Sequence, residues 1–201
     1  MIKNQPLEFD SPDQDDETAR ADLYGLLASL FSSPPPQSLL DTIGASQAGG
    51  GAVLELAWAE LVAACKSARQ EAVRAEYEQL FIGVGKPEVM LYGSFYLSGF
   101  LMEKPLAVLR TDLAALGLER QQAVVESEDH IATLCEVMRY LIASEDAAMA
   151  TQKTFFANHM QPWVLRACDA IDAHPDARFY RAVAALARAF FDVEMQAFDM
   201  L

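Results

Sequence analysis

The sequence predicts an all-α protein, a single-domain helical bundle of about eight to ten helices. Apolar residues recur at the 3.6-residue spacing of amphipathic helices along almost the whole chain, and no stretch keeps the period of two that half-buried strands show. The chain of 201 residues is 52% hydrophobic and holds only 10 glycines and 9 prolines, as expected for a globular protein. We therefore expect a flexible acidic segment over residues 1–15, followed by one helical domain over residues 16–201.

Four helices are expected in the N-terminal half of the chain. The first covers residues 16–31 and ends at a Ser-Ser-Pro-Pro-Pro run, because proline cannot continue a helix. A short helix over residues 37–43 precedes the glycine-rich turn 44–51. Helices over residues 53–67 and 71–81 follow, and their apolar stripes favour an antiparallel pair.

An apolar loop over residues 82–100 separates these helices from the C-terminal half. Four glycines and one proline interrupt the helical period there, yet many of the other residues are aromatic or aliphatic. A loop this apolar must be packed down or bind a partner. Further helices are expected over residues 103–116, 127–143, 147–173 and 176–198, with a kink or break at Pro162 in the third of them.

The charge and the cysteine pattern exclude several classes of protein. Fifteen basic against 29 acidic residues give a formal charge of −14, which disfavours nucleic acid and anionic lipid and favours basic partners. No apolar run approaches the roughly 20 residues of a membrane-spanning helix, and the acidic N-terminus does not resemble a targeting peptide, so we expect a cytoplasmic protein without stable membrane insertion. Cys65, Cys135 and Cys168 lie far apart in apolar helical sequence, which indicates buried thiols.

No motif for catalysis, a cofactor or a metal is present in the sequence. The Gly85-Lys86 pair could belong to a phosphate-binding loop, but Leu80 replaces the first glycine and Pro87 replaces the hydroxyl residue. His130, His159 and His174 lack a closely spaced second ligand, so each is expected to be hydrogen-bonded or on the surface. We therefore predict that the chain is not an enzyme and needs no cofactor or metal.

The stretch ESEDHIATLCEVM, residues 126–138, places a polar cluster ahead of an apolar helix. Ser127 is expected to be the N-cap of this helix, with acidic residues at the positive end of its dipole. At 100° per residue, His130 lies on the buried side of the helix, whereas Asp129, Glu136 and Tyr140 share another face and are expected to be exposed. Two interpretations of His130 remain open: a histidine satisfied within the core, or one that organises a binding surface.

The same stretch resembles the E-x-x-D-H-x-x-x-x-L-x-x-M signature of the TorD/DmsD/NarJ-type redox-enzyme maturation proteins. A second similarity lies upstream, where the Y-x-x-L-F pattern at residues 77–81 precedes a glycine-containing loop and the aromatic segment 92–96. The resemblance extends over roughly residues 16–198. The residues that fit the first signature are Glu126, Asp129, His130, Leu134, Glu136 and Met138.

The resemblance implies a cytoplasmic, all-helical chaperone for a molybdenum-containing oxidoreductase. Such proteins bind the twin-arginine signal peptide of a partner enzyme, or its apo form, until the molybdopterin cofactor has been inserted. Carboxylates can accept the two guanidinium groups, and an apolar groove can accept the helix that follows them. We expect Asp129, helped by Glu126 and Glu136, to receive the basic residues, and His130 to hold the helix start against the loop. The residues expected to line the apolar path are Leu80, Phe81, Leu91, Tyr92 and Phe95.

Two other functions are weighed against this one. The first is a nucleotide-binding regulator, which the incomplete phosphate-loop pattern disfavours. The second is a structural helical subunit of a respiratory complex. The partner enzyme is not identified by the sequence, and both a monomer and a homodimer are compatible with a helical bundle whose loops can exchange between protomers.

Overall fold

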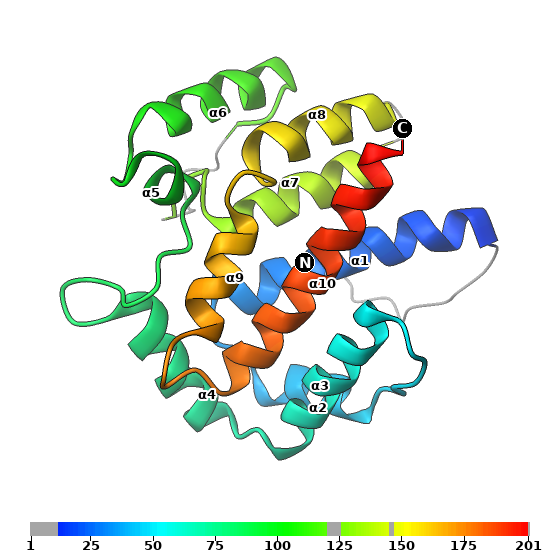
Figure 1. Cartoon of the computed structure of the whole chain (residues 1–201), viewed down its shortest axis with the longest axis vertical. Helices are drawn as coiled ribbons and strands as arrows, with labels where there is room; N and C mark the ends of the chain where they lie inside the picture. Colours follow the sequence, from blue (N-terminus) through cyan, green and yellow to red (C-terminus); the bar gives the residue numbers. More distant parts are fainter. Residues whose placement is uncertain (1–11, 120–125, 145–146, 201) are drawn as a thin grey trace.

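Helices make up nearly all the regular structure in the computed structural model, which describes residues 12–119, 126–144 and 147–200 (Figure 1). Within these ranges the sole β-type pairing is an isolated antiparallel bridge between Tyr92 and His130. This confirms the predicted all-α class. The elements are α1 (Pro12–Ser32), α2 (Gln37–Ala45), α3 (Val53–Ser67), α4 (Gln70–Tyr77), a π-helical turn (Glu78–Ile82), α5 (Gly93–Ser98), α6 (Lys104–Ala115), α7 (Ile131–Ala143), α8 (Met149–His159), α9 (Val164–Asp172) and α10 (Phe179–Asp199).

Most helix boundaries agree with the sequence prediction to within a few residues. Helix α3 matches its predicted range, and α4 with the π-helical turn covers the range expected for the fourth helix. The predicted break at Pro162 is confirmed, because α8 ends at His159 and α9 begins at Val164. Of the acidic segment predicted over residues 1–15, residues 1–11 lie outside the described residues, and residues 12–15 form the beginning of α1.

Three expectations about the helices are wrong. Helices α3 and α4 do not pair along their length; instead α3 packs against α2 and α10, where its buried apolar residues find partners. Helix α5 was expected as loop, because it begins at Gly93 and is followed by Gly99, and its six residues show no periodic pattern. Helix α7 begins at Ile131 rather than at residue 127, because Asp129 and His130 are held in an extended bridge with residues 91–93.

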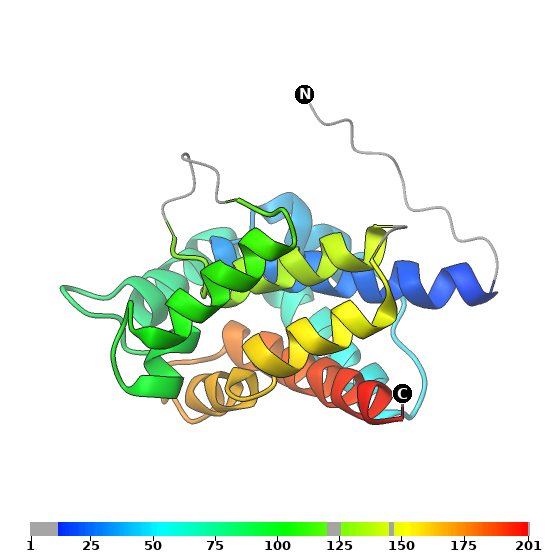
Figure 2. The ribbon, with the colours of Figure 1, turned by 90° about the horizontal axis from the view of Figure 1, so that it is seen from above.

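The core lies between two helical layers. Helix α1 packs along α7, and the view in Figure 2 shows this pair above α9 and α10. Helix α10 contributes the longest buried stripe and contacts α1, α3, α4 and α9. The three cysteines are buried and unbonded to one another, which confirms their predicted state. Burial raises the pKa of the Cys65 thiol to about 11, so it stays protonated at neutral pH.

A buried ion pair ties the two layers together. The guanidinium of Arg20 on α1 donates from Nε to the Glu194 carboxylate on α10 at 2.8 Å. The Tyr24 hydroxyl donates to the same carboxylate at 2.9 Å, and Gln152 on α8 accepts from Arg20 at 3.3 Å. Glu194 is almost fully buried, so these bonds replace the water that its charge has lost.

A carboxylate from α4 caps the long C-terminal helix. Glu76 accepts the backbone N–H groups of Arg178, Phe179 and Tyr180 at distances between 2.8 and 3.1 Å. These are donors that the first turn of α10 cannot pair internally. Within the described ranges, no helix combines the length and the apolar character that crossing a bilayer requires.

Candidate functional site

The start of α7 is bound to the loop that carries α5. The Ile131 N–H donates to the Leu91 carbonyl at 2.8 Å, and the Gly93 N–H donates to the Asp129 carbonyl at 2.9 Å. These bonds form the short antiparallel bridge between Tyr92 and His130. The aromatic segment 92–96 and the beginning of the stretch 126–138, which both resemble the maturation chaperones, are therefore brought together in space.

Asp129 is buried, which contradicts the expectation of an exposed carboxylate that receives arginine. Only 4% of its surface is exposed. Its Oδ2 accepts the backbone N–H of Ser94 at 2.8 Å, and its Oδ1 accepts the hydroxyl of Ser127. The helical-wheel argument failed because Asp129 precedes the first helical residue, where 100° per residue does not apply. Its carboxylate caps α5 instead.

His130, rather than Ser127, is the N-cap of α7. Its Nδ1 accepts the Ala132 N–H at 3.2 Å, which leaves the proton of the neutral ring on Nε2. The ring is 4% exposed, so the predicted buried position is confirmed, and it meets the Tyr92 ring edge-on at 5.0 Å. Burial lowers the pKa of His130 below its ordinary value of 6.5, although the carboxylates of Glu126 and Asp129 act in the opposite direction.

An acidic pocket of about 460 Å³ lies between the end of α1 and the start of α7. Glu126, His130 and Glu136, three of the predicted peptide-binding residues, line it together. The remaining lining residues come from both helices: Ala28, Ser29 and Ser32 from α1, and Ala132 and Thr133 from α7. None of these described lining residues is lysine or arginine. The pocket can therefore accept a cationic group.

The two glutamates of the acidic pocket differ in their surroundings. Glu126 accepts the hydroxyl of Tyr92, and this bond, after burial, raises the pKa of Tyr92 above its ordinary value. Glu136 is exposed and lies 3.6 Å from the guanidinium of Arg139, which is itself half-exposed. Such a surface ion pair is weak and can be exchanged for a stronger one.

The apolar residues predicted to line a peptide path are mostly part of the core. Leu80, Phe81 and Leu91 are buried, and the Phe81 ring packs edge-on against Tyr180 at 4.9 Å. The loop after the π-helical turn folds back onto it, where the Val89 N–H donates to the Leu80 carbonyl at 2.8 Å. Phe95 and Tyr92 are both half-buried. The Phe95 ring packs against Tyr96, and the Tyr92 ring packs against His130.

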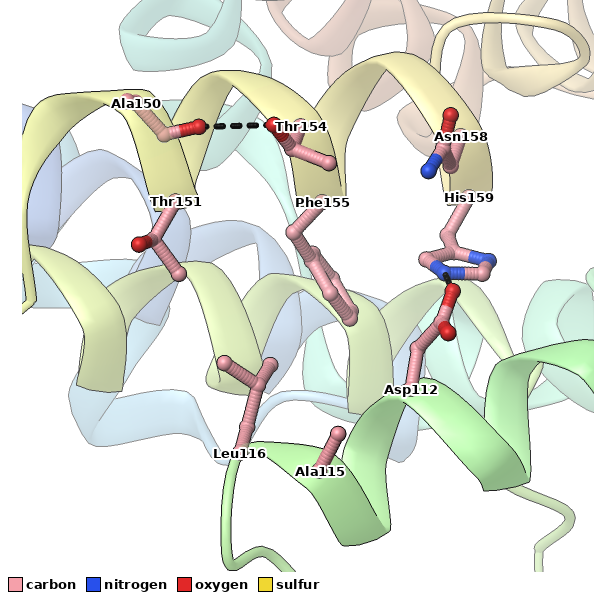
Figure 3. A pocket seen from close by; sticks show the side chains of 9 residues that line it. All are labelled: Asp112, Ala115, Leu116, Ala150, Thr151, Thr154, Phe155, Asn158 and His159. Atoms are coloured by element: carbon pink, nitrogen blue, oxygen red, sulfur yellow. Dashed lines mark hydrogen bonds and ion pairs between the residues drawn. The ribbon is translucent and has the colours of Figure 1, made fainter.

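Two further hollows lie on the other side of the Asp129-His130 pair. One, of about 390 Å³, is lined by residues of α5 and α6 together with Asp129 and His159. The next, of about 410 Å³, lies between α6 and α8, where His159 Nε2 is 2.8 Å from Asp112 (Figure 3). The sequence offered no signal for this contact, since the two residues are 47 positions apart. Among the described residues, no group of three or more His, Cys, Asp or Glu side chains is placed to hold a metal.

Comparisons with known proteins show the family of the chain and its similar relatives. Residues 50–169 match the family described as the nitrate reductase delta subunit. The chaperone protein TorD of Vibrio cholerae is 28% identical over 149 residues, which cover 66% of this chain and 66% of that relative, slightly under two thirds of its length. TorD of Vibrio parahaemolyticus is 25% identical over 182 residues. The match covers 85% of this chain and 77% of the length of that relative.

A solved structure shares the fold. It is described as a putative redox enzyme maturation protein from Archaeoglobus fulgidus, and it superposes on the present structure with a TM-score of 0.61. The match covers 94% of this chain and 99% of that chain, and the sequence identity is 18%. The matched family covers more than half of the present chain, including the loop before α5 and the start of α7. The chain therefore belongs to the nitrate reductase delta subunit family, and it is similar in sequence to the TorD chaperones.

Proposed function

We propose that this chain is a cytoplasmic chaperone that binds the twin-arginine signal peptide, or the apo form, of a molybdopterin-containing oxidoreductase during cofactor insertion. It acts by binding its client rather than by catalysing a reaction. Membership of the family and the likeness to the TorD chaperones support the class of function. The acidic pocket supports the contact with the signal peptide.

The observation that carries the proposal is the pairing of Glu126 and Glu136 in one pocket beside His130. Carboxylates accept guanidinium groups through two parallel hydrogen bonds, which is why arginine is favoured where a carboxylate must be recognised. An arginine of the peptide would replace Arg139 as the partner of Glu136. Asp129 contributes indirectly, because both of its carboxylate oxygens are used within the chain.

The charge of the whole chain supports the same partner. A formal charge of −14 attracts a basic peptide over a distance and speeds its encounter with the pocket. Exposed charge pairs are screened beyond roughly 8 Å at physiological ionic strength, so the affinity for the peptide should fall as salt is added.

The direct test is a calorimetric titration with a synthetic signal peptide that carries Arg-Arg ahead of an apolar helix. Glu126→Gln removes the charge but keeps an acceptor for Tyr92, and Glu136→Gln removes the other charge. Each should weaken binding about tenfold, the usual cost of losing a hydrogen bond to a charged group. Glu60→Gln is the matched control, because this exposed glutamate lies on α3, away from the pocket.

Two results of this titration would contradict the proposal. One is an equal loss of affinity in Glu60→Gln, which would mean that only the net charge matters. The other is equal affinity for a peptide in which Lys-Lys replaces Arg-Arg, since lysine cannot make the paired hydrogen bonds.

Capture of partners from the native cytoplasm tests the role of the complex. A chaperone should recover the apo form of one molybdoenzyme and release it once the cofactor is loaded. A stable stoichiometric complex with the mature enzyme would instead indicate a structural subunit of a respiratory complex. A large thermal stabilisation by a nucleotide would favour the regulator.

A further inference from the structure

One face of α6 lines both hollows beyond Asp129. Pro105, Val108 and Leu109 contribute to the first hollow, and Asp112 and Ala115 to the second. These positions are three or four residues apart, so they form a continuous stripe along the helix. Leu116, at the C-cap of α6, extends the stripe to the far end of the second hollow.

Helix α8 forms the opposite wall of the second hollow and reaches the first. Asn158 and His159 line both hollows, while Thr151 and Phe155 line only the second. Helix α6 packs against α5, and α8 packs against α7, so the two walls stand apart and are bridged by the bond between Asp112 and His159 (Figure 3). The two hollows therefore adjoin along α6 at the contact between Asp112 and His159, and they are together called the α6–α8 groove.

The end of the α6–α8 groove nearest α5 has an exposed apolar rim. Phe100 is 70% exposed and Met102 is 78% exposed, and both follow directly on α5. Leu97 and Val108 are also exposed, and they line the first hollow themselves. An apolar surface that adjoins a groove marks a binding site, because water is released from both when a partner covers them.

Charge identifies the kind of partner that fits. The Asp112 side chain is 41% exposed in the middle of the groove, and none of the described lining residues is lysine or arginine. A second copy of this chain would bring its own charge of −14 to this face. A partner with an apolar surface and a positive charge is complementary to both features.

We infer that the α6–α8 groove binds an amphipathic helix of the client enzyme, with its apolar face against Val108 and Leu97 and a lysine or arginine directed at Asp112. This inference rests on the chaperone function proposed above, because the client supplies the helix. The twelve residues of α6 extend for about 18 Å, which accommodates roughly three turns with apolar anchors at i, i+3, i+4 and i+7.

The α6–α8 groove is distinct from the acidic pocket. Asp129 lines the first hollow of the groove, whereas the next residue, His130, lines the acidic pocket. Consecutive residues in the extended segment before α7 point to opposite sides. The client would thus be held at two places, by its basic signal peptide in the acidic pocket and by a helix in the α6–α8 groove.

The test is a fluorescence-anisotropy titration of the full chain with a labelled synthetic helix of about 18 residues, long enough to be helical when bound. The probe has leucines at i, i+3, i+4 and i+7 and one central lysine, and a second probe has glutamate in place of that lysine. The chain should bind the lysine probe at least about tenfold more tightly than the glutamate probe. Asp112→Asn should abolish most of this preference.

Val108→Asp should raise the dissociation constant of the lysine probe at least about tenfold, because it puts a charge in the apolar wall. Val193→Asp is the matched control, since Val193 is similarly exposed (43% against 49%) but lies on α10 outside the groove. Thermal melting of both variants establishes that they are folded. Hydrogen exchange of the unaltered chain should slow in α6 and α8 when the lysine probe is added.

The inference is overturned if the lysine probe does not bind, if Val193→Asp weakens it as much as Val108→Asp, or if exchange slows elsewhere but not in α6 and α8. Its failure can be told apart from failure of the proposed function. The signal-peptide titration depends on Glu126 and Glu136, whereas the lysine probe depends on Val108 and Asp112, so either site can fail while the other stands.

Discussion

Asp129 caps helix α5 across 35 positions of sequence, with its Oδ2 accepting the Ser94 N–H at 2.8 Å. The Ser127 hydroxyl donates to the other carboxylate oxygen of Asp129, and the backbone carbonyl of Asp129 accepts the Gly93 N–H. A residue that resemblance alone would assign to the peptide contact is therefore a positioning residue. It fixes α5, and with it one end of the α6–α8 groove, against the start of α7.

The cap predicts a cost in stability when Asp129 is changed. Asp129→Ala leaves the buried Ser94 N–H without its acceptor and should lower the free energy of unfolding by about 1.5 to 3 kcal/mol, the range for hydrogen bonds to charged groups. Urea denaturation measures this loss. Ser127→Ala is the matched control, because it keeps the bond to Ser94 and should cost less. If the two variants lost the same stability, the capping role would be wrong.

Gly93 permits a close approach between α5 and α9. A Cβ atom at this position would lie 2.9 Å from Nε1 of Trp163, a buried side chain that donates to the His159 carbonyl. Gly93→Ala should therefore destabilise the fold by about 1 to 3 kcal/mol, as overpacking does. Gly51→Ala serves as the control, since nothing lies within 4 Å of its Cβ position. Equal melting temperatures for the two variants would contradict the close contact.

His130 predicts a dependence of stability on pH. Burial lowers its pKa in the folded chain, so between this lowered value and 6.5 the unfolded chain binds a proton that the folded chain does not. The contribution of His130 to the free energy of unfolding is therefore complete above about pH 6.5 and is lost as the pH falls below that value. His130→Asn keeps a good N-cap without the titration. Its melting temperature should fall less than that of the unaltered chain between about pH 7 and pH 5; parallel curves would exclude the effect.

The ion pair between α1 and α10 predicts a large effect of one arginine. Arg20→Met leaves the buried Glu194 carboxylate without its counter-charge and should cost about 3 kcal/mol of unfolding free energy. Arg139→Met, which breaks the exposed pair with Glu136, should change stability by less than about 1 kcal/mol. Chemical denaturation compares the two. Adding Glu194→Gln to Arg20→Met should recover part of the loss, because the isolated charge is then removed.

The sequence predicted most helices because the information for a helix is local. The 3.6-residue apolar spacing and the proline and glycine stops set the ranges of α1, α3, α6 and α10 to within a few residues. The apolar surroundings of the three cysteines in the sequence indicated their burial, which the structure confirms. His130 is buried as predicted, but it is the N-cap and so lies outside the helix whose wheel was used to place it. Helix α5 escaped prediction because its six residues, of which the first is a glycine, are too few to show a period.

The candidate site was only partly predictable. The resemblance identified Glu126, His130 and Glu136, which the fold brings into one pocket. It also pointed to the loop before α5 and the start of α7, which lie side by side in the structure. It did not show that Asp129 points away from that pocket, because a helical wheel cannot describe residues outside the helix. Nor could it show that Leu91 is buried within the core.

The sequence by itself determined the all-α class, most of the helix ranges and the acidic character of the chain, all of which follow from neighbouring residues or from totals. Only the tertiary structure decided which polar groups are partners. Ser94 and Asp129 are 35 positions apart, and Arg20 and Glu194 are 174 apart. The packing of the helices decides such partners. A buried charge or a buried N–H group forms a hydrogen bond with the donor or acceptor that the fold brings within about 3 Å of it.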